Sequence, residues 1–526
     1  RADFGKEARD MFRLREHGTT VGSEIRGGLV TFLTLSYILF VQPAVLSAVG
    51  MPRNDVFVAT CVCSALACFL MGILTNYPFA LAPAMGHNFF FAFTVCSALG
   101  FGFLWPEALL ANLVAGAIFL CLSFVGLREA IMHAVPDSLK YAIAVGIGLL
   151  IAFVGLQYGG IVQNSPAVLV RLGDLASPVV LVVLVGIAVT AVLTTLEFRG
   201  AILGGILATA ILAVVLGRVA YHQPDGLECI TEGQFLERAG VTRGAVDAIV
   251  PVPPGAVRVV LAEPRPSESL LGRVVALPHW PRETLGAVFR KPGDLFRNHS
   301  LADVLLVIFI FFFLDMFDTV GTLIGVSERA GFLDERGRLP RARWALFSDA
   351  AGTVMGAVVG TSTITTYVES AAGVKEGART GLAAIVTGVL LLLALVFAPL
   401  VEMIGMGAHF VHADTGETLR QVVAGTPVEI KFYPVIAPVL VVIGVMMMGS
   451  VRKIRWEDYD EAIPAFLMIV VMQFSFSITD GIAWGFISYV LLKLVTRRAR
   501  EIHVLVALFA VLFIGMYVAR AFLTGS

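Results

Sequence analysis

Three acidic residues lie in stretches that are otherwise apolar enough to cross a bilayer. Asp315 and Asp318 belong to residues 305–325 (LLVIFIFFFLDMFDTVGTLIG), and Glu369 belongs to residues 361–373 (TSTITTYVESAAG). A carboxylate at the centre of a membrane costs roughly 2.5 kcal/mol or more, so such acids usually face a bundle interior or a polar cavity. Asp315 and Asp318 share one face of a helix, where a single cavity could contact both carboxylates. We expect these acids to bind a ligand or carry a proton, the structural alternative being a cap or an ion pair with a distant arginine.

The composition is that of a membrane protein with many spans. Of 526 residues, 57% are hydrophobic and only 15% are charged, which is unlike a soluble enzyme of this length. The net charge of −1 shows no basic surplus, so nucleic acid is not a predicted partner. Of the six cysteines, five lie in apolar stretches, and their spacing matches neither a disulfide framework nor a zinc site. The sequence predicts no metal and no organic cofactor.

Windows of about 20 apolar residues mark the candidate transmembrane helices. Two further stretches are apolar but interrupted: residues 76–100, broken at Pro83 and Gly86, and residues 361–376. Proline blocks a regular helix, and broken backbone is tolerated at membrane depth only where it lines protein or water. The regular spans are predicted at 24–48, 55–76, 105–126, 136–157, 177–195, 199–219, 302–326, 344–360, 379–404, 433–450, 463–478 and 481–497, and a last apolar run covers 504–523.

Polar segments between the spans set the orientation. Residues 220–300 and 405–432 are predicted loops, and the first could hold a short hairpin around 256–263 or be an irregular linker. Four stretches rich in Lys and Arg are expected to stay in the cytoplasm. These stretches are 1–23, 328–343, 452–455 and 496–500. With both broken stretches counted as spans, this orientation gives a multi-pass protein of the plasma (inner) membrane with a cytoplasmic N-terminus and two extracytoplasmic loops.

The fourteen predicted segments divide into two sets of seven. The loop at 220–300 separates the sets, and the interrupted stretch is the third segment in each set. An odd number of spans per set makes the halves antiparallel, and substrate sites in such inverted repeats lie near the midplane, where broken helices meet. The predicted fold is therefore an all-α polytopic membrane protein, built as a 7+7 inverted repeat with its site at the two broken segments.

Four strings of residues resemble a known family. The strings are APAMGHNFFFAF (82–93), DMFDTVGTLIG (315–325), GTSTITTYVESAAGV (360–374) and EAIPAFLMIVVMQFSFSITDGIAWGFISYVLLKL (461–494). They resemble the nucleobase:cation symporter-2 family, and within it the AzgA-like permeases for hypoxanthine, adenine and guanine. The similarity covers nearly all of the membrane part, but neither residues 221–270 nor the tail beyond Arg500.

The resemblance implies a core domain (24–126 and 301–404) and a gate domain (127–219 and 433–498), while the last apolar run predicts a tail with an extra apolar segment (499–526). Members couple uptake to protons and move the core against the gate like an elevator. They are often dimers, here expected as a homodimer through the gate domain. Segments 3 and 10 each pair a short extended strand with a half helix in the family. The β-branched residues of segment 10 suit an extended strand independently.

Carried over position by position, the resemblance implies roles for individual side chains. The expected substrate-binding residues are Asp315, Glu369, Asn88, Ala84, Phe89 and Thr366, and the expected proton-coupling residues are Asp318 and Asp315. The chemistry fits, because a purine presents N–H donors that a carboxylate can accept in pairs. Glu369 lies at the expected start of a half helix, where unpaired backbone N–H groups favour negative charge.

The chain departs from the family pattern at several positions beside these residues. It has Ala84, His87 and Phe89 where the pattern has Gly, Leu and Ala, and Gln42 where the pattern has Asn. His87 could retune the pocket or simply face a neighbouring helix, and Phe89 could stack on a planar ring or only pack. Asp480 is expected to be a cap or turn residue at the start of the last helix of the repeat.

The function expected from these observations is uptake of adenine, guanine and hypoxanthine by proton symport. The alternatives are another nucleobase such as xanthine, urate or uracil, a small anion such as sulfate or bicarbonate, and a passive channel. Glu369 and Asp315 would repel an anion but could accept hydrogen bonds from a neutral base with N–H donors. An enzyme is not expected, because a proteolytic aspartate pair should meet across helices, whereas Asp315 and Asp318 share one helix.

Overall fold

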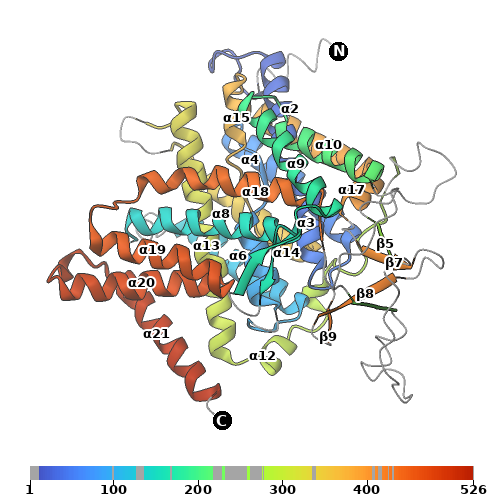
Figure 1. Cartoon of the computed structure of the whole chain (residues 1–526). Helices are drawn as coiled ribbons and strands as arrows, with labels where there is room; N and C mark the ends of the chain where they lie inside the picture. Colours follow the sequence, from blue (N-terminus) through green and yellow to red (C-terminus); the bar gives the residue numbers. More distant parts are fainter. Residues whose placement is uncertain are drawn as a thin grey trace. The chain divides into compact units, whose positions relative to one another are not determined.

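Helices dominate the chain (Figure 1). The computed structural model describes residues 11–97, 100–125, 135–165, 169–216, 228–231, 257–260, 275–276, 278–334, 339–405, 409–412, 418–423, 426–428 and 432–524. The helices are α2 (Val21–Leu35), α3 (Ile38–Ser47), α4 (Arg53–Thr75), α5 (Met85–Phe89), α6 (Trp105–Val125), α8 (Asp137–Tyr158), α9 (Pro178–Thr195), α10 (Ala201–Leu216), α12 (Asp294–Asn298), α13 (Leu301–Ala330), α14 (Ala342–Val359), α15 (Ser370–Lys375), α16 (Gly381–Leu393), α17 (Ala398–Gly405), α18 (Ala437–Met447), α19 (Tyr459–Ser475), α20 (Ile478–Val495) and α21 (Val504–Thr524). Short π and 3₁₀ turns are η1 (Phe90–Val95), η3 (Ala287–Phe289), η4 (Ala394–Val396), η5 (Met448–Lys453) and η6 (Ala499–Glu501).

Each regular span predicted from hydropathy coincides with helix in the structure. The span predicted at 24–48 consists of α2 and α3, and the span predicted at 379–404 consists of α16, η4 and α17. By length and composition, six helices of the described chain could cross a membrane: Val21–Ser47, Arg53–Thr75, Trp105–Ser123, Asp137–Tyr158, Leu301–Glu328 and Ile478–Val495. The positions of the helices are therefore confirmed, while the count of fourteen spans stays a prediction.

The chain divides into two compact units. The first unit contains Arg1–Ile151, Ala276–Ala398 and Ile443–Ser526, and the second contains Ala152–Val275 and Pro399–Val442. This division cuts through α8 and α18. The predicted core and gate domains are a separate division, which stays a prediction.

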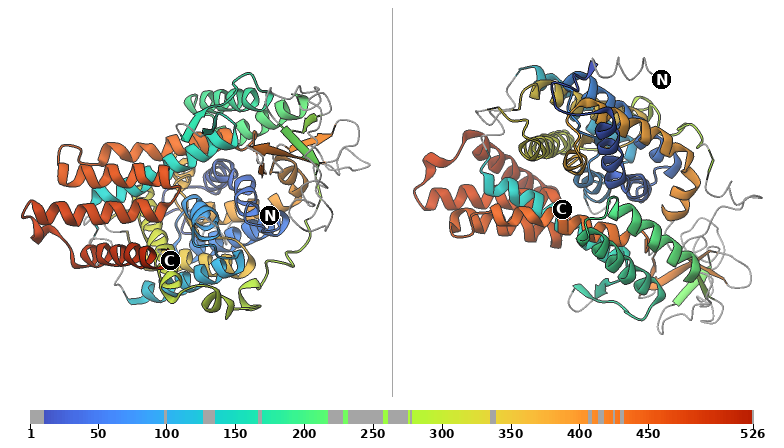
Figure 2. Two further views of the ribbon diagram at one scale, coloured as in Figure 1. Left: turned by 60° about the horizontal axis from the view of Figure 1, so that its bottom comes forward. Right: turned by 90° about the horizontal axis from the view of Figure 1, so that it is seen from above.

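Within the first unit, α4 packs against α14 and α16, and α14 packs against α6. The contact between α4 and α16 is close, because a Cβ atom on Gly72 would lie 2.6 Å from the carbonyl oxygen of Gly381. Only glycine permits this approach of the two backbones. The C-terminal helices α19, α20 and α21 lie side by side in succession (Figures 1 and 2).

The second unit contains more strand than the sequence predicts. Helix α9 packs on α10, and β2 (Val162–Ser165) pairs with β3 (Leu169–Leu172) as a hairpin. A five-stranded antiparallel sheet has the order β4-β8-β7-β5, with β9 on β8. Its strands are β4 (Glu228–Thr231), β5 (Val257–Val260), β7 (His409–His412), β8 (Thr418–Val423) and β9 (Thr426–Val428).

This sheet corrects two predictions. The fold is mostly helical rather than all-α, and the described part of the predicted hairpin around 256–263 is a strand, β5, that pairs with β7 rather than with a neighbour in sequence. The strands of the two predicted loops, 220–300 and 405–432, therefore pair with each other. Strands this short show little alternation of apolar and polar residues. No local pattern indicates that β5 pairs with a strand separated from it in sequence by six described helices.

Candidate functional site

Two short strands join the interrupted segments of the chain. Strand β1 (Leu81–Pro83) pairs antiparallel with β6 (Ile364–Thr366), with Ala82 opposite Thr365. The pairing continues beyond the strands, because the Ala84 amide donates to the Thr363 carbonyl at 2.9 Å and the Tyr367 amide to the Ala80 carbonyl at 2.9 Å. Each strand thus satisfies the backbone groups that the other leaves unpaired, as a broken segment at membrane depth requires. The strands expected for segments 3 and 10 are confirmed.

A short helix follows each strand and carries candidate site residues. Helix α5 (Met85–Phe89) follows β1 and continues as the π-helix η1, and α15 (Ser370–Lys375) follows β6. Both strands are completely buried, and so is most of α5. The antiparallel pairing of β1 with β6 brings the starts of α5 and α15 close together, although they are far apart in sequence. The sequence predicts the site at this place.

Glu369 occupies the N-cap position of α15 and is held by a tyrosine. Tyr37 Oη donates a hydrogen bond to Glu369 Oε1 at 2.8 Å. Tyr37 is buried at the break between α2 and α3, while Glu369 is half-buried. The Tyr37 ring lies 6.3 Å from that of Tyr367, whose hydroxyl donates to the Pro83 carbonyl of β1. Tyr37 did not stand out in the sequence, because a single tyrosine in an apolar span is ordinary.

Asp315 on α13 is buried among threonine hydroxyls. Thr353 Oγ1 lies 3.3 Å from Asp315 Oδ2, and Thr319 Oγ1 lies 3.4 Å from Asp315 Oδ1. Thr353 also donates to the Ile364 carbonyl at 3.0 Å, and Thr319 lies 2.9 Å from the Thr365 hydroxyl. These contacts connect Asp315 to strand β6.

Asp349 on α14 belongs to the same network, although the sequence analysis did not select it. Its carboxylate accepts the Thr366 amide at 3.0 Å and the Thr319 hydroxyl at 2.7 Å. The Thr366 hydroxyl lies 3.3 Å away. The side chain is fully buried. The signal that pointed to Asp315, an acid inside an apolar span, was present here too in residues 344–360.

Asp318, one turn beyond Asp315, has different surroundings. Its side chain keeps 42% of its accessible surface, whereas the neighbouring His87 keeps 2%. His87 Nδ1 on α5 lies 4.0 Å from Asp318 Oδ2. Asp318 also lies near enough to Glu369 and Asp349 for the like charges to repel one another. Asp318 and Glu369 are therefore the two acids of the site with accessible surface, while Asp315 is enclosed.

The other predicted residues of α5 and β6 are buried. Asn88 Oδ1 accepts a hydrogen bond from the Ser362 hydroxyl, and Gln42 Nε2 donates to Ser362 at 3.1 Å. Ala84 is the N-cap of α5, and Thr366 ends β6. Phe89 is buried and stacks on Phe93 with ring centroids 5.6 Å apart. In this conformation Asn88 and Ala84 link the two broken segments, through Ser362 and Thr363.

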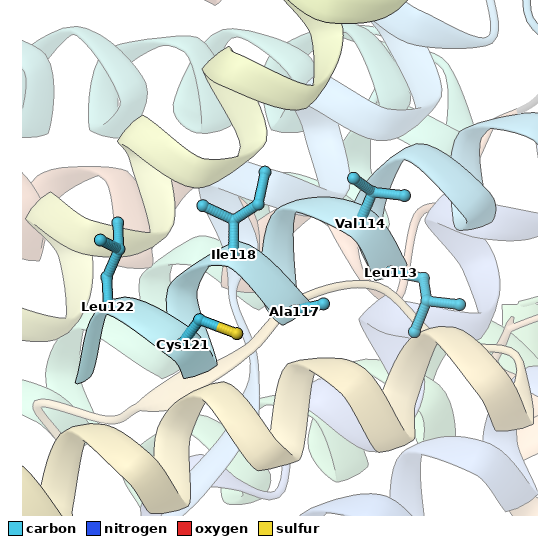
Figure 3. A pocket seen from close by; sticks show the side chains of 6 residues that line it. All are labelled: Leu113, Val114, Ala117, Ile118, Cys121 and Leu122. Carbon is cyan, nitrogen blue, oxygen red and sulfur yellow. The ribbon is translucent and has the colours of Figure 1, made fainter. Parts of the chain in front are cut away.

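An open apolar groove elsewhere in the first unit has no chemistry for a polar ligand. It follows one face of α6 and is lined by Leu113, Val114, Ala117, Ile118, Cys121 and Leu122 (Figure 3). No donor or acceptor other than a thiol lines it, so it does not compete with the β1–β6 region as a site for a polar molecule.

Comparison with known proteins supports a transporter. The family model Xan_ur_permease, described as "Permease family", matches residues 22–408. The chain is 36% identical to the guanine/hypoxanthine permease PbuO of Bacillus subtilis, over 96% of this chain and 98% of the relative. It is also 36% identical to the adenine permease AdeP of Escherichia coli, over 96% of this chain and 94% of the relative.

The fold has solved counterparts at low sequence identity. The transmembrane domain of a cyanobacterium bicarbonate transporter, BicA, superposes with a TM-score of 0.53 at 13% identity, covering 88% of this chain and 96% of that domain. At this identity the likeness concerns the fold alone. The fold is that of a membrane transporter.

Proposed function

Since this chain belongs to the permease family whose model it matches over residues 22–408, and is thus a transporter rather than an enzyme, we propose that it carries purine nucleobases across a membrane. Relatives aligned over nearly their whole length are guanine/hypoxanthine and adenine permeases. Adenine, guanine and hypoxanthine are therefore the proposed substrates, and xanthine, urate and uracil are the alternatives within the same chemistry.

The observation that carries the proposal is the carboxylate of Glu369. Among the described residues, Tyr37 donates to its Oε1 at 2.8 Å, so Oε2 can accept an N–H group of a base. Asp318 lies nearby with accessible surface of its own. The Oε2 atom of Glu369 thus matches an N–H donor of a purine, and a hydrogen bond to a charged acceptor contributes about 1.5–3 kcal/mol.

The same charges oppose a small anion. A sulfate or bicarbonate ion beside Glu369 and Asp318 would add a third negative charge to groups that already repel one another. A solved transporter of similar fold carries bicarbonate, but the likeness reaches only the fold. Purine transport is the better-supported function.

We further propose that uptake is driven by protons, with Asp318 as the coupling acid. Acids at membrane depth often serve as proton relays, and of Asp315 and Asp318 it is Asp318 that has accessible surface from which to exchange a proton. The antiparallel β1–β6 pair supports an inverted repeat of fourteen spans. The proposal has three further parts. The core domain moves against the gate domain like an elevator, and the protein is a homodimer through the gate domain. It lies in the plasma membrane with its N-terminus in the cytoplasm.

The test is uptake into proteoliposomes. Purified protein is reconstituted, an inward proton gradient is imposed in sodium-free buffer, and labelled adenine, guanine, hypoxanthine, xanthine, uracil and bicarbonate are compared. We expect saturable uptake of one or more purines, blocked by an excess of unlabelled purine and abolished by a protonophore. The variant Glu369→Gln, which replaces an acceptor with a donor, is expected to lose binding by on the order of 30-fold or more.

Separate outcomes would contradict separate parts of the proposal. Uptake of bicarbonate without uptake of any base would overturn the substrate class. Purine uptake that survives the protonophore but needs sodium would overturn proton coupling alone. Purine binding in Glu369→Gln within about threefold of the parent would remove Glu369 from the site.

A further inference from the structure

A buried histidine lies beside Asp318, one of the two acids of the site with accessible surface. His87 lies on α5, and its Nδ1 is 4.0 Å from Asp318 Oδ2. The imidazole is almost completely buried, and its Nε2 has no hydrogen-bond partner among the described residues. Packing alone does not explain a buried titratable ring that has one nitrogen beside a carboxylate and the other without a partner among the described residues.

The surroundings decide which nitrogen carries the proton. A buried N–H group without an acceptor is rarer than a buried acceptor without a donor. The neutral ring therefore holds its hydrogen on Nδ1, where Asp318 lies, and leaves Nε2 bare. At 4.0 Å the contact is longer than a hydrogen bond, so the attraction between the N–H dipole and the carboxylate is electrostatic in this conformation.

The charges that act on Asp318 from its neighbours are negative. The elements packed against α5 include α3, η1 and α13. Neither α3 nor η1 contains a charged residue, and α13 contributes Asp318 and, one turn before it, Asp315. Beyond Asp318 lie Asp349 and Glu369, which repel its ionised form. His87 is the group on α5 that can offset this repulsion.

We propose that His87 is a positioning residue for the proton site: through Nδ1–H it favours the ionised form of Asp318 and so sets the pH at which Asp318 takes up its proton. When a proton binds Asp318 Oδ2, the carboxyl group becomes a donor facing another donor, and the contact weakens. When the proton leaves, the contact is restored, and His87 keeps its own hydrogen throughout. This inference rests on the proposed role of Asp318 in proton-driven purine uptake.

The experiment measures initial uptake of a labelled purine against external pH in proteoliposomes. In the parent, uptake rises as pH falls through a midpoint. The variant His87→Leu removes the donor, so the ionised form is less favoured and the midpoint should move to higher pH by about 0.5 to 1 unit. His87→Gln keeps an N–H donor and should stay within about 0.3 unit of the parent.

The matched control is His299→Gln, which alters a partly buried histidine beside another carboxylate, Glu107 at 3.0 Å, outside the site. It should leave the midpoint in place. Purine binding measured by thermal shift establishes that each variant is folded, and His87→Met replaces His87→Leu if the latter is not. An unmoved midpoint in the folded apolar variant, or an equal shift in His87→Gln, would overturn the inference. A parent insensitive to the protonophore would instead overturn the proposed coupling.

Discussion

At the scale of single residues, the site pairs each accessible acid with a buried aromatic or imidazole group. Tyr37 holds Glu369, and His87 lies against Asp318. A carboxylate with one oxygen engaged has fewer rotamers open to it, so less freedom is lost when a ligand binds the other oxygen. Affinity should therefore depend on these supporting residues as well as on the acids.

Removing the Tyr37 hydroxyl tests this dependence. Tyr37→Phe deletes the donor at 2.8 Å and leaves the ring in place. We expect purine affinity to fall about tenfold, since a hydrogen bond to a charged group contributes about 1.5 kcal/mol or more. The measurement is binding by calorimetry. Tyr158→Phe, which alters a tyrosine that packs on Tyr433, is the control and should bind as the parent does.

Asp315 and Asp318 of α13 should differ in their effect on stability. Asp315 lies against the Thr319 and Thr353 hydroxyls, which connect it to β6, so Asp315→Asn should lower both thermal stability and purine binding. Asp318→Asn should leave stability and base exchange intact and abolish uphill accumulation, because coupling needs a group that can release a proton. Thermal unfolding and uptake are measured on both variants. Lost binding with parental stability in Asp315→Asn would instead indicate the direct base contact that the sequence predicts.

At the scale of elements, glycines allow α15 to pack closely against α2. Helix α15 packs on α2, and a Cβ atom on Gly373 would lie 2.6 Å from the Gly27 carbonyl oxygen and 2.1 Å from the Thr31 hydroxyl. No side chain fits at this distance without moving one helix from the other. The position of Glu369 thus depends on a residue one turn further along the chain.

An added methyl group at this contact should disturb the site. Gly373→Ala is expected to destabilise the protein by about 1–3 kcal/mol and to weaken purine binding, because α15 must shift. Thermal unfolding and calorimetry measure the two effects. The control is Gly321→Ala on α13, where no atom beyond the adjacent residues and the backbone of α13 itself lies within 4 Å of the added carbon. Equal behaviour of the two variants would show that the α2–α15 contact is not tight in solution.

The success of prediction also differs by element. Helices follow from apolar runs, the break before α5 follows from Pro83, and the extended β6 follows from a run of threonines, because these signals are local. Strand β1 was implied only by the family resemblance. The five-stranded sheet and Asp349 were missed for different reasons. The sheet depends on pairing between loops that are distant in sequence, which no local pattern indicates. Asp349 lies in a stretch whose apolar residues predicted a span, and that prediction did not consider its single acid.

At the scale of the whole molecule, an ion cluster joins the C-terminal helices. Lys493 Nζ lies 2.9 Å from Asp460 Oδ2 and 2.6 Å from Glu501 Oε2, and Arg498 reaches Asp460 at 3.0 Å. Burial raises the pKa of Asp460, but Lys493 and Arg498 outweigh it and hold that pKa below its usual range. The cluster links α19, α20 and η6, so its loss should affect unfolding of the chain as a whole.

Lys493→Met should lower the free energy of unfolding by about 3 kcal/mol near neutral pH, because it leaves the buried Asp460 without its main partner. A lowered pKa means that the parent gains stability above about pH 3.9 and loses it as pH falls through the folded-state value. The difference between parent and variant should therefore shrink in acid. Thermal unfolding in detergent across this pH range measures it, and a difference that does not change with pH would contradict the assignment to Asp460.

The pairing of β1 with β6 also bears on how the chain is made. Residues 81–83 leave the ribosome long before residues 364–366, and until then the peptide groups of β1 lack the partner that membrane depth demands. Until the second half is synthesised, the third segment therefore lacks its partner strand. Its unpaired backbone groups must be covered by neighbouring helices or stay near the membrane surface. Closing so long a loop is slow, so assembly of the site should be a late event in biogenesis, completed only when the second half arrives.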